Sequence, residues 1–323
     1  MTLIADNAGG KPRLMVTEEA VDDLVTEVIR YPGHENACGL VGLTFANGSM
    51  AITGIIPASP MDIVRRESTA QFGGDTLAAA VEWMDINYGL LHPEDVKAKA
   101  EFTFFWKAHT HQQLKYSHFS STDNRSILDA VKKHGMQKAI GVLGIIDRME
   151  GTKRSNLGRT GLTAKRSFEV SLLFYYLDQE MVAKSQEEPI LLTPKIIKAK
   201  NVPALPPLPW SFTNEDSFKR QLRQLDEFGA RAVPLYRNVD KDPIQELQFV
   251  ISKPGKWKGT LFITTDWDYP KSAPLIQVLS DIDPTSPGKE LHEIKLDIEG
   301  KPIWTPESDF LDVVLELEEL KEL

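Results

Sequence analysis

The chain has 323 residues, of which 41% are hydrophobic and 26% are charged, and its formal net charge at pH 7 is -9. This composition is typical of a folded protein with room for two domains and argues against disorder. The excess of negative charge argues against nucleic acid and membrane surfaces as partners, because both are themselves negatively charged.

Cysteine usage and the N-terminus bear on the compartment. Cys38 is the only cysteine, so the chain can form no internal disulfide, which is typical of a reducing compartment. Residues 1–14 lack the apolar core of a signal peptide, and no apolar run approaches the roughly 20 residues that cross a bilayer. These features predict a cytoplasmic protein without a membrane anchor.

The first half of the chain alternates between helical and strand patterns. Thr17 and Glu18 open a sequence that resembles a capping box, and apolar residues at helical spacing follow, which predicts a helix that ends near Tyr31. Asn47 and Gly48 supply the positive φ values of a tight turn and predict a hairpin. The elements predicted for this half are the hairpin strands 37–45 and 50–57, a helix at 75–88, a strand at 102–108, a helix at 123–134 closed by Gly135, and a strand at 139–146.

The composition changes near the middle of the chain. Residues 191–210 contain five prolines and little periodicity, as expected of a semi-extended linker or a docking strap. We therefore predict an α+β domain at 1–188, a proline-rich linker at 189–210 and a second α+β domain at 211–323. The elements predicted for the second domain are a helix at 215–228, strands at 247–252 and 259–266, and an acidic amphipathic helix that starts at Ser308.

A short motif in the first domain carries the ligand types of a metal site. His109 and His111 follow the predicted strand, and residues two apart on a strand face the same side. Asp123 lies at the start of the next predicted helix and can supply a carboxylate. Two neutral imidazoles and one carboxylate form a common open zinc set, whose fourth position is left for water.

Hydrolysis at such a site needs further groups. A base must take a proton from the attacking water and pass it to the leaving group, and a buried glutamate suits this role. Ser120 lies three residues before Asp123, close enough to donate a hydrogen bond to an oxyanion. His118 is interpreted as a solvent-facing loop residue, and Cys38 as a small core residue rather than a nucleophile.

The residues of this region resemble the signature of the JAB/MPN (JAMM) metalloproteases, which is His-x-His, a spacer, Ser-x-x-Asp and an upstream glutamate. The resemblance implies a cytidine-deaminase-like α+β fold and a bound Zn²⁺. By the same resemblance, His109, His111 and Asp123 are the zinc ligands, Ser120 is the oxyanion donor and Glu35 is the catalytic base.

The register of the base admits two alignments. Glu35 lies seven residues before Gly42, which matches the family, whereas an alignment on Cys38 and the two residues after it would put Asn36 at the base position. Two further departures are Gln112, where the family usually has proline, and a spacer of eight residues between the second histidine and the serine.

The second domain resembles ubiquitin-conjugating enzymes. Residues 255–281 match that family's central strands and its Tyr-Pro-x-x-x-Pro turn, and residues 292–306 echo its Ile-Cys-Leu-Asp-Ile segment and later Trp-x-Pro. Lys295 stands where the family has its catalytic cysteine, and residues 283–285 replace its His-Pro-Asn. Thioester transfer needs a cysteine thiolate, so the resemblance implies a non-catalytic domain. Lys295 is either a natural loss or an engineered trap.

Together these observations predict a deubiquitinase-like zinc isopeptidase that cuts after the C-terminal glycine of a ubiquitin-like modifier. The expected partners are the modifier, its conjugates, and the activating or conjugating enzymes of the same pathway. One alternative is a non-catalytic scaffold of a conjugation complex. Another is a zinc hydrolase that matures a small sulfur-carrier protein or removes a small amide. Precursor maturation and tag removal are both open.

Overall fold

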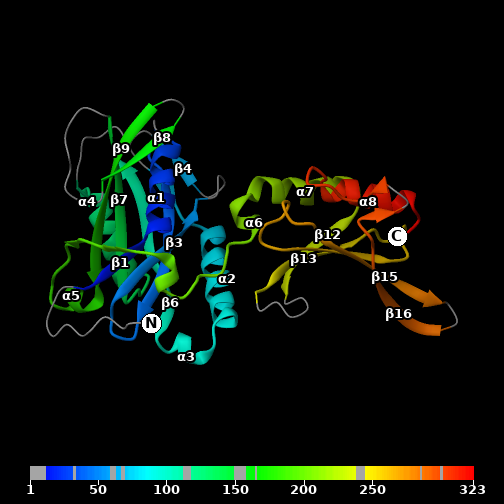
Figure 1. The fold of residues 1–323 in the computed structure, drawn as a ribbon, viewed down its shortest axis with the longest axis horizontal. Helices are drawn as coiled ribbons and strands as arrows, with labels where there is room; N and C mark the ends of the chain where they lie inside the picture. The colour runs from blue at the N-terminus through cyan, green and yellow to red at the C-terminus, as the bar shows by residue number, and fades with distance from the viewer. Residues whose placement is uncertain are drawn as a thin grey trace. The chain divides into compact units, whose positions relative to one another are not determined.

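The structure is a computed structural model that describes residues 12–31, 34–58, 63–66, 70–111, 118–148, 158–163, 166–237, 244–283, 286–298 and 301–323. For the described residues from 147 to 169 and from 280 to 290, and for residue 301, it describes the backbone alone. The chain divides into two compact units, Met1–Pro206 and Pro207–Leu323. Both units combine helices with sheets, so the predicted α+β class is confirmed (Figure 1). None of the helices in the described ranges has the length and apolar character needed to cross a membrane.

The first unit is built on a nine-stranded mixed sheet with strand order β10-β9-β7-β6-β2-β3-β1-β11, and β8 pairs with β9. Strands β2 and β6 are antiparallel, whereas β6 and β7 are parallel. The strands are β1 (Leu14–Thr17), β2 (Ala37–Phe45), β3 (Met50–Pro57), β6 (Ala100–His111), β7 (Lys138–Arg148), β8 (Gly158–Thr163), β9 (Arg166–Asp178), β10 (Ile190–Leu192) and β11 (Lys195–Ile197), with a separate pair β4 (Ile63–Arg65) and β5 (Ala70–Phe72).

Helices lie on both faces of this sheet. On β7, Ile140 and Val142 belong to the core under α1 (Glu18–Arg30), whereas Ala139 packs with the apolar side of α4 (Ser121–Lys132). This alternation follows from the period of two in a strand, and a strand buried on both faces is apolar throughout. The other helices of the unit are α2 (Asp75–Leu91), α3 (Glu94–Lys97), α5 (Gln179–Ala183) and the 3₁₀ turn η1 (Ala199–Asn201).

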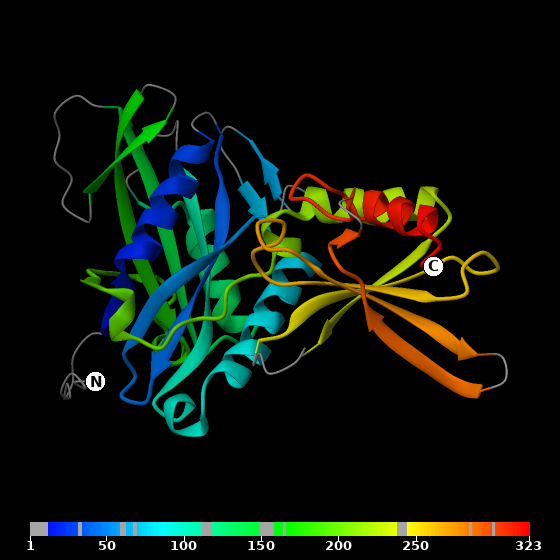
Figure 2. The ribbon, with the colours of Figure 1, turned by 45° about the vertical axis from the view of Figure 1, so that its right-hand side comes forward.

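The proline-rich segment is partly built into the first unit. β10 pairs with β9 at one edge of the sheet, and β11 pairs with β1 at the other. Because only Thr193 and Pro194 separate these two strands, and three residues span about 10 Å at most, the sheet must curl until its edges approach each other (Figure 2). Residues 190–197 are therefore part of the sheet of the first unit.

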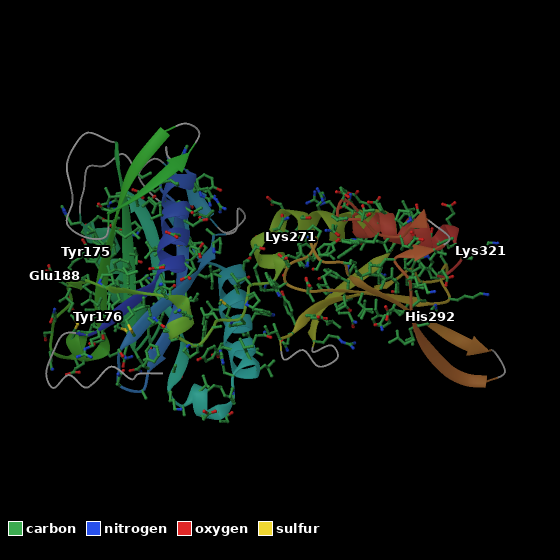
Figure 3. The ribbon with its side chains drawn as sticks, in the orientation of Figure 1. Tyr175, Tyr176, Glu188, Lys271, His292 and Lys321 are labelled. Atoms are coloured by element: carbon green, nitrogen blue, oxygen red, sulfur yellow. The ribbon has the colours of Figure 1, made fainter. Side chains whose placement is uncertain are left out.

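The second unit is a five-stranded antiparallel sheet, order β12-β13-β14-β15-β16, with two helices over it. Phe249 and Phe310 meet at its centre with ring centroids 4.6 Å apart, and Trp210 donates a hydrogen bond to Thr265 over 2.8 Å. Figure 3 draws the side chains of both units. The elements are α6 (Trp210–Thr213), α7 (Glu215–Glu227), β12 (Arg231–Arg237), β13 (Glu246–Ser252), β14 (Thr260–Thr265), β15 (Leu275–Asp283), β16 (Ser286–Glu293), β17 (Asp297–Ile298), β18 (Lys301–Pro302) and α8 (Phe310–Glu319).

Candidate metal centre

The C-terminal end of strand β6 presents two imidazoles on one face of the sheet. His109 and His111 are two residues apart, and their Nε2 atoms lie 3.3 Å from each other. β7 pairs with this part of β6, residue 109 opposite Leu143 and residue 111 opposite Ile145. Pairing with a neighbouring strand fixes the backbone of both histidines, so their side chains are directed by the sheet rather than by a loop.

Asp123 completes the group from the first turn of α4. Its Oδ1 lies 3.1 Å from Nε2 of His109, and its Oδ2 lies 3.3 Å from Nε2 of His111. The candidate ligand atoms of the three residues all lie within 4.8 Å of one another. The crossover from β6 through α4 to β7 thus brings a helix start back to the strand end that carries the histidines.

The donor set fits a metal ion. Neutral imidazole Nε2 atoms and a carboxylate are all acceptors, so three of them converging on one point are stabilised by a shared cation. The Asp123 carboxyl is ionised at neutral pH: burial opposes ionisation, but the neighbouring imidazoles of His109 and His111 hold its pKa well below its usual range. These three residues could therefore hold a metal ion, and their side chains are only 17%, 5% and 17% exposed.

Ser120 orients the carboxylate of this group. It is the N-cap of α4 and forms a capping box with Asp123. Both its backbone N–H and its hydroxyl donate to Oδ2 of Asp123 over 2.7 Å. The helix begins at Ser121 rather than at the predicted Asp123, because Asp123 is the N3 residue of a capping box whose N-cap is Ser120. The one hydroxyl proton of Ser120 is thus donated to Asp123 in this structure.

Replacing Ser120 by alanine tests this orienting role. We expect Ser120→Ala to lower the free energy of unfolding by about 1 kcal/mol through the lost cap. We also expect metal affinity to fall about tenfold, because the carboxylate loses one of the hydrogen bonds that hold it. Chemical denaturation and a chelator competition measure the two effects. Ser120→Thr keeps the hydroxyl and is the matched control; equal metal affinity in both variants would contradict the orienting role.

Glu35 lies near the candidate ligands, just before β2. It is 4% exposed, and its backbone N–H donates to the carbonyl of Arg66 over 2.9 Å. Burial raises the pKa of its carboxyl, the charges of the two histidines lower it, and the charge of Asp123 raises it. These interactions put the Glu35 carboxyl within electrostatic reach of all three candidate ligands.

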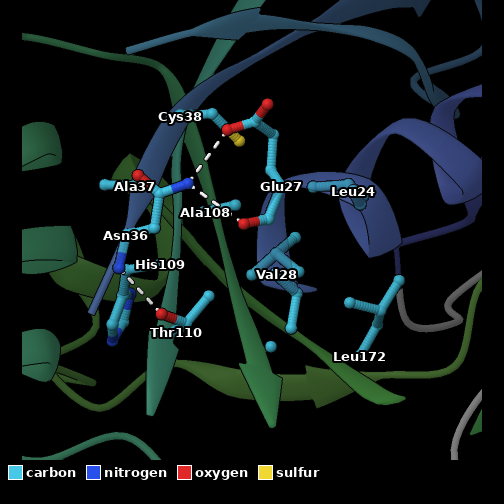
Figure 4. A pocket seen from close by; sticks show the side chains of 12 residues that line it. Leu24, Glu27, Val28, Asn36, Ala37, Cys38, Ala108, His109, Thr110 and Leu172 are labelled. Atoms are coloured by element: carbon cyan, nitrogen blue, oxygen red, sulfur yellow. Dashed lines mark hydrogen bonds between the residues drawn. The ribbon is translucent and has the colours of Figure 1, made fainter. Parts of the chain in front are cut away.

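Asn36 faces the other way. Its side-chain amide donates to the carboxylate of Glu27 on α1 over 2.9 Å, and Figure 4 shows the Asn36 side chain turned toward this helix. An amide has no basic group that could take a proton from water, and the Nδ2 of Asn36 already donates to the backbone carbonyl and the carboxylate of Glu27. Of the two registers that the sequence left open, the structure therefore brings Glu35, and not Asn36, to the histidine pair.

An aromatic stack that the sequence did not reveal supports His109. Phe119 stacks on Tyr175 of β9 with centroids 3.9 Å apart, and it lies 5.3 Å from the ring of His109. A Cβ at Gly141 would come within 2.7 Å of the Phe119 ring, so β7 needs a glycine there. Tyr175 is 64 residues beyond the second histidine, and no local pattern links it to the motif.

The remaining sequence-predicted residues lie outside the ligand group. Cys38 is buried, and burial together with the charges of Glu27 and Asp23 raises the pKa of its thiol, as expected of a core residue. His118 is exposed, and so is Lys295, which follows β16 in the second unit. Gln112 and the Pro284-Thr285 part of the replaced His-Pro-Asn segment lie outside the described residues.

The fold and the site thus define an α+β protein with a candidate metal centre of two histidines and one carboxylate, faced by a buried glutamate. A scan against known protein families finds no model that matches the chain, and a search of curated proteins finds no match either.

Proposed function

We propose that the chain is a zinc-dependent isopeptidase of the JAMM type that cuts after the C-terminal glycine of a ubiquitin-like modifier. The observation that carries this proposal is the meeting of His109, His111 and Asp123 at one point with Glu35 beside them. Two histidines, one carboxylate and a nearby glutamate are the groups that zinc-assisted amide hydrolysis requires. The proposal assigns zinc to the site because three N and O ligands leave one tetrahedral position open.

The order of elements supports a JAB/MPN fold for the first unit. The His-x-His strand β6, the Ser-x-x-Asp start of α4 and the parallel return strand β7 follow one another in the chain. The base candidate precedes β2, which is the antiparallel neighbour of β6. This arrangement brings the scattered parts of the motif to one end of two adjacent strands.

In the proposed mechanism, zinc when bound would lower the pKa of a water and polarise the scissile carbonyl. The carboxylate of Glu35 takes one proton from the attacking water and returns it to the nitrogen of the departing amine. Burial raises the pKa of Glu35, which makes it a better proton acceptor than an exposed glutamate. Ser120 holds Asp123 and, to stabilise an oxyanion, would have to exchange the Oδ2 of that residue for the substrate oxygen.

The second unit has the role of recognition in this proposal. Helix α7 precedes the antiparallel strands β12 to β15 in the chain, and β16 is the fifth strand of the same sheet. A helix followed by an antiparallel meander agrees with the order of a conjugating-enzyme-like domain. Lys295 has no thiol and so cannot form a thioester. The domain would bind the modifier or the pathway's activating or conjugating enzymes in the cytoplasm, and would raise the effective concentration of substrate.

The test compares three substrates for the zinc-loaded protein: a modifier fused to a peptide, a modifier joined to a lysine side chain, and a small peptide amide. Expected is cleavage of the modifier substrates after the C-terminal glycine, inhibited by a chelator and restored by zinc. Cleavage of the small amide alone would favour the small-substrate hydrolase. Zinc binding without cleavage of any substrate would favour the scaffold.

A further inference from the structure

A buried polar network surrounds Asn36, the residue next to the proposed base. We infer that Asn36 is a positioning residue: its contacts hold the chain so that Glu35 faces the candidate metal ligands. This inference rests on the proposed function, because Asn36 acts by orienting Glu35, which is the base in that proposal. Asn36 is only 1% exposed, and neither the JAMM motif nor the local pattern required an asparagine there.

Every polar group of Asn36 has a partner. Its side-chain Nδ2 donates to the backbone carbonyl of Glu27 over 3.0 Å and to Oε2 of the same residue over 2.9 Å. Its Oδ1 accepts from Nε of Arg65 on β4 over 2.8 Å. Its backbone N–H donates to Oγ1 of Thr110 over 2.8 Å, and its carbonyl accepts from the N–H of Thr110 over 3.0 Å (Figure 4).

These contacts favour one direction for Glu35, whose carboxyl also accepts a hydrogen bond from the backbone of Ala70. Successive residues of an extended chain project to opposite sides, so an Asn36 side chain held against α1 leaves Glu35 on the face of the imidazoles. Thr110 obeys the same alternation, because it lies between the two histidines and points away from them. The pair Asn36–Thr110 therefore sets the register of the base against the ligands, through two residues that contact neither substrate nor metal.

Glu35 depends on this network more than the ligands do. His109 and His111 are held by the β6 and β7 ladder, and Asp123 by its capping box. Glu35 precedes the first residue of β2, so no sheet ladder covers it, and its own backbone bond goes to Arg66 between β4 and β5. Removing the hydrogen bonds of Asn36 should thus displace the Glu35 carboxyl more than it weakens metal binding.

The test reverses one hydrogen bond. Asn36→Asp puts a carboxylate against that of Glu27, so the bond is replaced by repulsion. Adding Glu27→Gln supplies an amide donor from the helix side and restores the bond in the opposite sense. Each single variant, the double variant and the wild type are compared for zinc affinity, for kcat and KM on a modifier fusion, and by crystal structures of the zinc-loaded proteins.

Expected for Asn36→Asp is a fall in kcat of about tenfold to a hundredfold with KM and zinc affinity unchanged, and recovery of most of kcat in the double variant. The crystal structures should show the Glu35 carboxylate turned from the ligands in the single variant and returned in the double. An unchanged kcat, a parallel loss of zinc, or no recovery overturns the inference. If the zinc-loaded wild type cleaves no substrate, the proposed function fails, and the Glu35 position in the crystal structures still decides the inference.

Discussion

Glu35→Gln should abolish most cleavage while leaving the metal in place. The glutamine is isosteric but has no carboxylate to accept a proton, and the loss of a general base lowers the rate by about a hundredfold to ten-thousandfold. Zinc content should stay at one per chain, because Glu35 lies outside the ligand group. Steady-state kinetics on a modifier fusion and elemental analysis of the same samples measure the two quantities.

The matched control is Glu215→Gln in the second unit. Glu215 and Glu35 are 5% and 4% exposed, so both substitutions remove a charge from a buried site, but Glu215 pairs with Lys219 on α7. We expect this control to lower stability and to leave kcat within about threefold of the wild type, since it contacts no proposed reacting group. Full activity in Glu35→Gln would sink the assignment of the base.

His109→Ala should remove both the zinc and the stability that zinc confers. A ligand that binds only the folded state stabilises it by about 2.7 kcal/mol when its free concentration is roughly 100 times Kd. The wild type should therefore melt several degrees higher with zinc than with a chelator, whereas the variant should show no difference. Differential scanning calorimetry with and without zinc measures the shift, and elemental analysis measures occupancy.

His118→Ala controls for the general loss of an imidazole from this part of the chain. His118 is exposed and lies outside the ligand group formed by the described residues, so the variant should keep one zinc per chain and its thermal shift. A wild type that takes up no zinc, or a His109→Ala variant that still binds it tightly, would refute the metal centre and leave the scaffold as the better explanation.

Local patterns predicted much of the secondary structure. Helices α1, α2, α4, α7 and α8 and the β2–β3 hairpin are confirmed to within a few residues, because amphipathic periodicity, caps and the Asn-Gly turn are encoded within each segment. The strands that were not predicted include the long strand β9 and strand β12. The short strands β1, β10 and β11 were not predicted either. Each has only three or four residues and pairs with distant segments, so its stability comes from partners that the local sequence does not contain.

The sequence by itself determined the chemistry of the candidate site: the identities of His109, His111 and Asp123, and a choice of two residues for the base. Only the tertiary structure shows that the Asn36 amide is bonded to Glu27 on α1, whereas the Glu35 carboxyl interacts with the histidines, because these directions depend on where α1 and β6 lie. The stack of Phe119 on Tyr175 and the bond between Asn36 and Glu27 join segments that meet only in the folded sheet. The sequence alone shows which residues have side chains that can bind a metal, whereas the packing of the folded chain determines whether these side chains meet.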